Sequence, residues 1–136
     1  MNKNEPVIVF CDGGSRGNPG PSALGAVILN KDNDVIEEIG KYLGVQTNNY
    51  AEYSAVIAAL EKIHEMGITK ADFFLDSQLI VRQLNGQYRV KNANMIPLNA
   101  EVNRLSVGLD LTFTHVYRED NTLADAVVNQ ILDGQK

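Results

Sequence analysis

The sequence predicts a mixed α/β fold, and two changes of pattern along the chain indicate it. Through the first third, short β-branched and apolar runs alternate with turns rich in glycine, proline and asparagine, which is typical of antiparallel strands. From Asn48 onward, apolar residues recur at steps of three and four, the period of an amphipathic helix. Strand-like and helical segments then alternate, so we expect at least one parallel crossover packed by a helix.

Three strands are expected before the first helix. The first covers residues 7–11 and leads to Asp12, after which residues 13–21 are dense in turn formers and predict an elaborate turn. The second strand is expected over residues 24–29. The third, over residues 35–43, has the mixed pattern of an edge strand. Together they predict an antiparallel meander.

The long helix that starts near Asn48 sets the order of the later elements. Asn48 or Asn49 can cap its start and Gly67 can end it, which places Glu52 in the first turn. Beyond it we expect a strand over residues 71–75, a helix over 77–84, a short helix after Pro97, a strand over 109–117 and a closing helix over 121–132. The closing helix should bury Leu123, Ala124, Val127, Val128 and Ile131.

Composition limits the class of protein. The 136 residues suit one domain, residues 1–136, and 44% hydrophobic with 21% charged residues is ordinary globular usage. Residues 1–6 are polar and no apolar run is long enough to span a membrane, so we expect a soluble, cytoplasmic protein with no signal peptide. Cys11 is the only cysteine, which excludes an internal disulfide and a multi-cysteine zinc site and favours a packing role in a strand.

Charge is distributed unevenly along the chain. The net charge of −5 argues against binding nucleic acid by bulk electrostatics. Residues 79–104, however, hold four cations against one acid, a net charge of +3 that leaves −8 elsewhere. The four cations are Arg82, Arg89, Lys91 and Arg104.

Four acids lie at the ends of expected elements, where a fold can bring them together: Asp12, Glu52, Asp76 and Asp125. Each alone has a structural explanation, as a turn former after a strand or as a complement to a helix dipole. Clustered carboxylates repel, so such a group is stable mainly when a hard cation neutralises it. Oxygen ligands without a cysteine or histidine pair favour Mg²⁺ or Mn²⁺ over zinc. Two such ions, about 3.5–4 Å apart, would support phosphodiester hydrolysis.

Four short motifs surround these acids: DGGSRGNPGP at residues 12–21, TNNYAE at 47–52, DSQ at 76–78 and NTLAD at 121–125. In this order and at these separations they resemble the four motifs of type 1 ribonuclease H, over about residues 7–129. The resemblance implies a ribonuclease H-like fold: a five-stranded mixed sheet, three antiparallel strands then two parallel, with helices on both faces. It also implies that the four acids hold two Mg²⁺ ions, with Mn²⁺ as a substitute.

The activity that the resemblance implies is endonucleolytic hydrolysis of the RNA strand of RNA/DNA hybrids, giving 5′-phosphate and 3′-hydroxyl ends. By the same resemblance, Asn18, Asn49 and Gln78 contact the minor groove, where the 2′-hydroxyls of RNA are displayed. Asn18 is also a turn residue beside Pro19, and Asn49 also a candidate helix cap; both functions can coexist. Double-stranded RNA is a second candidate substrate, and we expect a monomer.

The sequence departs from the family pattern in the loop before the last helix. Many bacterial members carry a histidine there, whereas this chain has Arg118, as in archaeal and related short enzymes. Arginine stays protonated, so its help would be electrostatic rather than basic; the alternative is a loop cation that only contacts phosphate. His115 shares a strand face with Phe113 and Tyr117 and is expected to pack, and His64 is expected to lie on the surface.

Bacterial relatives often carry a strongly basic protrusion before the helix that precedes the last strand, and residues 87–92 are only modestly basic by comparison. We also expect no separate hybrid-binding domain. We therefore expect weaker, more salt-sensitive binding, with Arg89 and Lys91 contacting the substrate backbone together with Arg82 and Arg104. The alternative is that these four are ordinary solvated cations.

Three other functions compete with hybrid cleavage. A hybrid- or RNA-binding module of the same fold would gain nothing from four acids facing phosphates. Another nuclease of the wider group, such as a junction resolvase or a DNA exonuclease, would be identified by cleavage of a DNA duplex. A purely structural α/β domain would leave the four acids as a coincidence.

Overall fold

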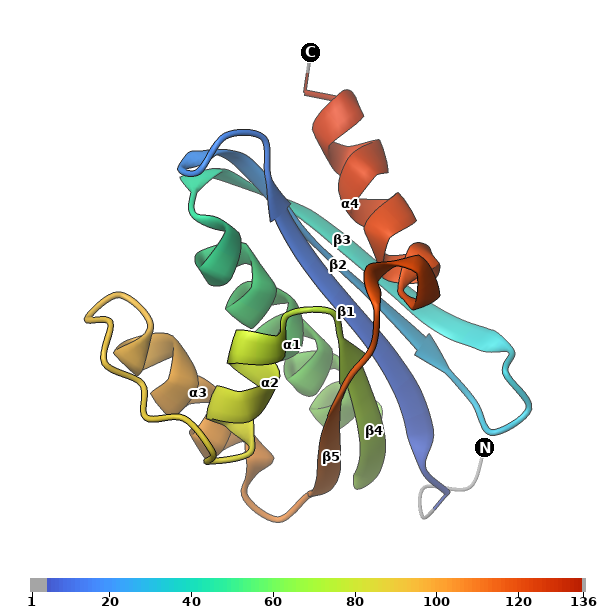
Figure 1. Ribbon diagram of the computed structural model, residues 1–136. Coiled ribbons are helices and arrows are strands. Elements are labelled where there is room, and N and C mark those ends of the chain that lie inside the picture. Colours follow the sequence, from blue (N-terminus) through green and yellow to red (C-terminus); the bar gives the residue numbers. More distant parts are fainter. Residues whose placement is uncertain (1–4, 136) are drawn as a thin grey trace.

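Five strands form one mixed sheet in the computed structural model, which describes residues 5–135 (Figure 1). They are β1 (Val7–Ser15), β2 (Gly20–Leu29), β3 (Val35–Gln46), β4 (Lys70–Leu75) and β5 (Asp110–His115). Across the sheet the order is β3-β2-β1-β4-β5, with the first three strands antiparallel and β4 and β5 parallel to β1. The expected sheet of three antiparallel and two parallel strands is confirmed.

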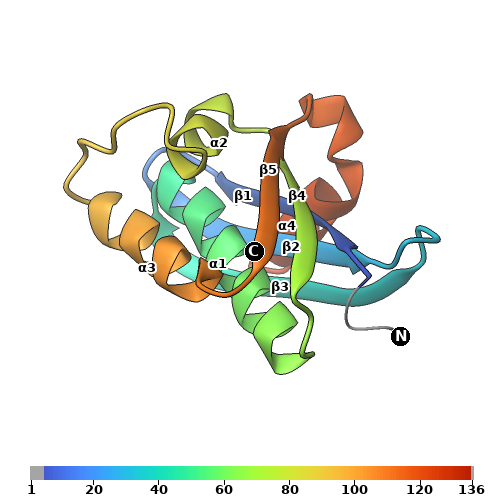
Figure 2. The same ribbon diagram turned by 90° about the horizontal axis from the view of Figure 1, so that it is seen from below.

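Helices cover both faces of the sheet, as expected. They are α1 (Asn48–Glu65), α2 (Gln78–Leu84), α3 (Ile96–Ser106) and α4 (Thr122–Asp133), with a short 3-10 helix, η1 (Arg118–Asp120), before α4. The first three helices lie on one face and α4 on the other (Figures 1 and 2). No helix in the described part of the chain is long and apolar enough to cross a membrane. Residues 1–4, most of the polar start, lie outside the described residues.

The main hydrophobic core lies between β1, β2 and β4 on one side and α1 on the other. Small side chains on α1, such as Ala55 and Ala59, are fully buried, which lets the helix approach the sheet closely. Cys11 belongs to this core, with its thiol directed at the Ala55 carbonyl, 3.8 Å away. The packing role expected for Cys11 is therefore confirmed.

The first hairpin is longer than predicted, because residues 13–15 and 20–21 of the turn-forming run are paired strand. The turn itself covers only residues 16–19. Gly13 is needed not for a turn but for close approach: a Cβ there would lie 2.1 Å from the carbonyl carbon of Ala51 in α1. The third strand likewise continues past the predicted end at residue 43, because Gln46 still pairs with Gly20.

Glycines also allow α4 to lie directly on the other face of the sheet. A Cβ on Gly25 of β2 would lie 2.6 Å from the carbonyl oxygen of Ala124, and one on Gly40 would lie 2.8 Å from Val127. The expected inward face was wrong at Leu123, which is 45% exposed, because Ala124 and its successors occupy the positions over these glycines. Asp125, in the first turn of α4, thereby lines the same cavity as Asp12 of β1.

We predict that Gly25→Ala destabilises the fold by about 1–3 kcal/mol, because the new methyl group forces α4 away from β2. Urea unfolding measures the effect. Gly134→Ala is the matched control, since its new Cβ would meet nothing closer than 3.5 Å, and we expect a change within about 0.5 kcal/mol. Equal unfolding midpoints for the two variants would contradict the close packing of α4.

Candidate metal centre

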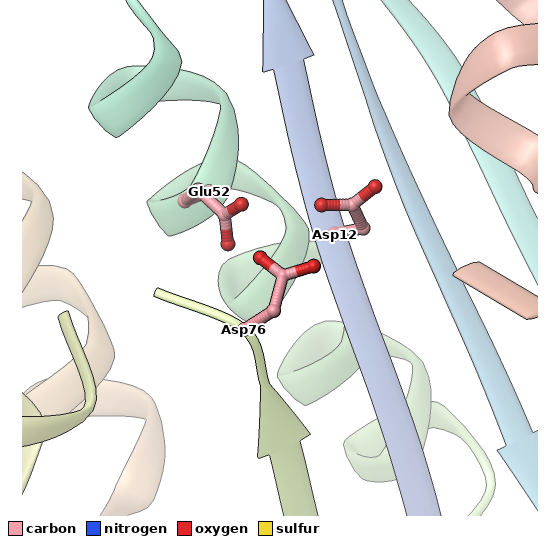
Figure 3. Close-up of side chains that lie close together, drawn as sticks. All are labelled: Asp12, Glu52 and Asp76. Carbon is pink, nitrogen blue, oxygen red and sulfur yellow. The ribbon is translucent and has the colours of Figure 1, made fainter. Parts of the chain in front are cut away.

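Three carboxylates, carried by β1, by α1 and by the residue after β4, meet in one place (Figure 3). Asp12, Glu52 and Asp76 each offer one oxygen, and these oxygens lie within 4.8 Å of one another. Asp12 and Glu52 are buried, with 6% of each exposed, and Asp76 is half-buried. The sequence prediction that these three acids converge is confirmed by this geometry.

Strand pairing and one glycine bring the three acids together. In the parallel pair of β1 and β4, Cys11 is opposite Leu75, so Asp12 and Asp76 follow as neighbours. The absence of a side chain at Gly13 lets the backbone of Glu52 pass against β1. Two local expectations were wrong: Asp12 lies within β1 rather than at its end, and Glu52 lies in the second turn of α1.

The start of α1 also differs from prediction. Thr47 is the N-cap, and its hydroxyl accepts the N–H of Tyr50 at 3.1 Å. The next residue, Asn48, instead connects α1 to the first hairpin. Its side-chain Oδ1 accepts the backbone N–H of Ser15, and its backbone N–H donates to Asn18 Oδ1. A threonine hydroxyl caps a helix as an asparagine amide does, so the three polar residues were not distinguishable by type alone.

Asp125 lies across the same cavity, which has a volume of about 470 Å³ and is lined by all four acids. It comes from the first turn of α4 and is not part of the tight group of three. Asn129, one turn later, donates from Nδ2 to Asp125 Oδ2 at 3.1 Å. The four predicted metal-ligating residues therefore share one cavity, with Asp125 the most outlying.

Burial and mutual repulsion make the cluster hold protons when no cation is present. Burial, and then the charge of Asp76, raises the pKa of Asp12 to about 7. Burial, followed by the charges of Asp12 and Asp76, raises the pKa of Glu52 well above its ordinary value. Glu52 Oε2 is also buried without a hydrogen-bond partner among the described residues. An all-oxygen cluster with an orphaned acceptor fits a hard divalent cation.

Arg118 stands at the mouth of this cavity. It is the first residue of η1, its side chain is 80% exposed, and its guanidinium nitrogen lies 3.9 Å from Asp125 Oδ1. His115, by contrast, is half-buried in β5 and meets the ring of Tyr117 edge-on. This arrangement agrees with a charged role for the arginine and a packing role for the histidine.

The amides expected to contact substrate lie beside the carboxylates. Asn49 lines both the metal cavity and a smaller adjoining one of about 120 Å³, and Asn18 lines the smaller one. Gln78 is exposed at the first position of α2, next to Ser77, which lines the metal cavity. Sequence reasoning missed further polar residues of the smaller cavity, namely Thr47, Asn92 and Asn94. The amide-rich stretch at residues 92–94 was a signal, but only the fold brings it opposite Asn49.

The four cations differ in their positions. Arg89 and Lys91 are exposed in the loop between α2 and α3. Arg82 is held against Tyr88, with its guanidinium carbon 5.1 Å from the ring centroid and a 2.6 Å hydrogen bond to the hydroxyl. Arg89 and Lys91 are therefore the cations left to reach a substrate from this loop.

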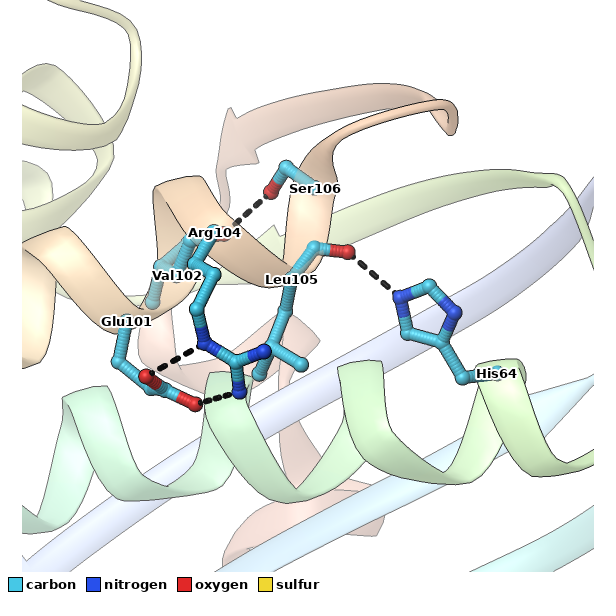
Figure 4. A network of polar contacts seen from close by, with 6 residues as sticks. All are labelled: His64, Glu101, Val102, Arg104, Leu105 and Ser106. Atoms are coloured by element: carbon cyan, nitrogen blue, oxygen red, sulfur yellow. Dashed lines mark hydrogen bonds and ion pairs between the residues drawn. The ribbon is translucent and has the colours of Figure 1, made fainter.

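Arg104 lies at the other end of the molecule, which corrects its expected role in substrate contact. It binds Glu101 through two hydrogen bonds on α3 (Figure 4). Nearby, His64 at the C-terminal end of α1 contacts the Leu105 carbonyl at 2.6 Å, whereas the metal cluster lies near the start of α1. His64 is exposed, as expected, but it also joins α1 to α3.

The chain resembles known proteins along most of its length. A family model described as reverse transcriptase-like matches residues 10–131. Ribonuclease HI of Halobacterium salinarum is 40% identical over 128 residues, which cover 93% of this chain and 64% of that relative. The chain thus spans less than two thirds of that protein's length.

Two solved structures share the whole fold. The N-terminal RNase H domain of Mycobacterium tuberculosis Rv2228c, solved as a fusion with maltose-binding protein, superposes with a TM-score of 0.92 at 36% identity and covers 96% of each chain. LC11-RNase H1 in complex with an RNA/DNA hybrid gives a TM-score of 0.91 at 37% identity, over 95% of this chain and 98% of that one.

We predict that Asp12→Asn stabilises the metal-free protein at neutral pH. In the folded parent the Asp12 carboxyl keeps its proton up to about pH 7, whereas in the unfolded chain it ionises near its ordinary pKa of 3.8. The parent's unfolding free energy should therefore fall as the pH rises from about 4 to about 7, by at most about 1.4 kcal/mol per pH unit for one proton.

Urea unfolding in chelator, across this range, measures the difference between parent and variant. The difference should be smallest near pH 4, grow toward pH 7 and shrink when Mg²⁺ is added, because the cation stabilises the ionised parent. Asp110→Asn makes the same chemical change at an exposed acid at the start of β5 and is the control variant. A variant advantage that stays constant with pH would contradict the raised pKa of Asp12.

Proposed function

The chain belongs to the type 1 ribonuclease H family, and on that premise we propose that it hydrolyses the RNA strand of RNA/DNA hybrids. The observation that carries the proposal is the cluster of Asp12, Glu52 and Asp76, whose oxygens lie within 4.8 Å of one another in a cavity bordered by amides. The reaction would be endonucleolytic and leave 5′-phosphate and 3′-hydroxyl ends.

The four carboxylates, Asp12, Glu52, Asp76 and Asp125, would hold the cations. Mg²⁺ usually takes only one or two protein carboxylates and completes its shell with water and substrate phosphate, so four carboxylates are enough for two ions. Oxygen-only donors support Mg²⁺, with Mn²⁺ as a substitute. When bound, two such ions supply an activated water and neutralise charge on the leaving oxygen.

The amides would recognise the substrate by its minor groove. Amide groups both donate and accept hydrogen bonds, which suits the 2′-hydroxyls that distinguish RNA from DNA. Asn49 supports this role best, because it lines the cavities on both sides of the start of α1. Asn18 and Gln78 would extend the contact on either side of Asn49. A hybrid substrate is also supported by the similar LC11-RNase H1, which was solved in complex with an RNA/DNA hybrid.

Arg118 would act on the phosphate rather than on a proton. Its side chain is largely exposed yet lies 3.9 Å from Asp125, so it can turn from that carboxylate to a bound phosphate. A guanidinium remains protonated and offers paired donors, which suits charge neutralisation and excludes the part of a general base.

The remaining expectations about partners and location stay predictions. Arg89 and Lys91 would contact the substrate backbone from their exposed loop. Cleavage of double-stranded RNA, a monomeric state and a cytoplasmic location are each proposed here on the sequence reasoning alone. A non-cleaving binding module is the main competitor. The cluster of buried acids at the centre of the cavity argues against it, because their ionised forms would repel phosphate unless cations neutralised them.

We expect the parent to cut the end-labelled RNA strand of a hybrid with Mg²⁺ or Mn²⁺ and to be inactive in chelator. Asp76→Asn should lose at least about 100-fold in kcat, because a neutral amide cannot replace an anionic ligand. Asp110→Asn, the same chemical change at an exposed acid, should cut like the parent. Intact RNA under every metal, with the hybrid still bound, would favour the binding module, and cleavage of a DNA duplex would favour another nuclease class.

Charge reversal in the exposed loop should weaken substrate binding and leave turnover unchanged. Arg89→Glu and Lys91→Glu should each raise KM several-fold and reduce its dependence on salt, with kcat close to the parent's. Arg104→Glu is the matched control, since it carries the same charge change at the far end of α1. If both loop variants keep the parent's KM, Arg89 and Lys91 do not contribute to substrate binding.

A further inference from the structure

Asn121 connects three of the elements that carry the acids. It is fully buried between η1 and α4. Its Nδ2 donates to the carbonyl of Cys11, the residue before Asp12, at 2.9 Å, and to Asp76 Oδ2 at 3.2 Å. Its backbone carbonyl accepts the N–H of Asp125 at 3.1 Å. One side chain and its own peptide group therefore contact β1, the end of β4 and α4.

The side chain of Asn121 does not cap α4, although Asn121 occupies the N-cap position of that helix. Asparagine at a helix N-cap usually accepts an N–H of the first turn, but Asn121 makes no such bond to α4. Its Oδ1 is also buried without a partner among the described residues. Both features cost folding free energy, and residues that break local rules in this way are typical of functional sites.

The orientation of this amide is determined by its neighbours. Both hydrogens of Nδ2 point to oxygen acceptors, the Cys11 carbonyl and the Asp76 carboxylate. Rotating the amide by half a turn would place Oδ1 against these two oxygens, which would repel it. The two hydrogen bonds are therefore linked, and the link fixes Asp76 relative to the strand that carries Asp12.

We propose that Asn121 is a positioning residue for the metal centre, which holds the Asp76 carboxylate in place beside Asp12. Asp76 lies just beyond the end of β4 and is half-buried, so repulsion from Asp12 and Glu52 favours rotation of its side chain toward solvent. A neutral amide opposes that rotation without neutralising the carboxylate. A lysine or arginine in its place would compete with the cation for the same oxygen. The inference rests on the proposed metal-dependent function.

Direct metal titration tests this role independently of catalysis. We would titrate Mn²⁺ into parent, Asn121→Ala and Asn121→Ser by calorimetry, at a temperature where all three are folded. Outer partners of metal ligands typically contribute about 10- to 100-fold in affinity, and we expect a loss of that size in Asn121→Ala. Asn121→Ser keeps one donor proton for two acceptors, so it should fold more readily and still bind the metal more weakly.

Val102→Ala controls for stability alone. Val102 is buried in α3, away from the acids, and its truncation should lower the unfolding midpoint without changing the Mn²⁺ affinity. Hybrid cleavage gives a second readout: because Asn121 is fully buried, its variants should lower kcat at saturating hybrid and leave KM unchanged.

The outcomes separate this inference from the function on which it rests. Weaker Mn²⁺ binding in both Asn121 variants, with Val102→Ala like the parent, would support the positioning role. Unchanged affinity in the Asn121 variants would overturn it while leaving the metal site intact. An equal loss of affinity in Val102→Ala would also overturn it, because affinity would then follow stability. A parent that binds no Mn²⁺ would overturn the proposed metal centre itself, and this inference with it.

Discussion

Repulsion between carboxylates is the constraint on which the rest of this structure depends. Asp12 and Glu52 are buried side by side, with Asp76 close by, and in a medium of low polarity they cannot all be ionised without a counter-charge. The protein must therefore hold them together with interactions that do not neutralise their charge. Those interactions come from rigid strands, from a helix that contacts the sheet backbone and from a neutral amide. Because a bound cation relieves the repulsion between the acids, the repulsion favours cation binding.

Close backbone approach is how the fold meets this constraint. At Gly13 the start of α1 passes against β1, and at Gly25 the start of α4 lies on β2, so two helices bring acids to the same region from opposite faces. The side of the molecule that carries the amides is fixed by similar contacts. Asn18 in the turn of the first hairpin accepts a hydrogen bond from the backbone N–H of Asn48 at the start of α1. Arg16 in the same turn binds Asp133 at the end of α4 at 2.7 Å. The carboxylate and amide sites are therefore parts of one rigid unit.

The proposed action of this acidic protein on nucleic acid is compatible with its net charge, because its charges are separated in space. The acids of the metal centre would be neutralised by cations. The adjoining cavity is lined by uncharged residues, four of which are asparagines, and Arg89 and Lys91 are exposed in the loop between α2 and α3. Long-range attraction is then modest, and recognition depends on short-range hydrogen bonds. This balance fits a domain whose affinity is sensitive to salt.

The sequence by itself determined the order and type of the elements, because each depends on local periodicity, and the four acids, because their motifs are contiguous in the chain. Only the tertiary structure decided how glycines and amides are used. Gly13 belongs to a strand rather than a turn, since the reason for a glycine there is a helix that begins 35 residues later. Arg104 could not be separated from Arg89 by residue type. Asn121, expected only as the first residue of the closing helix, makes its contacts with residues 45 and 110 positions away. Such roles depend on contacts between segments that are distant in the chain, so they cannot be predicted from a local sequence pattern.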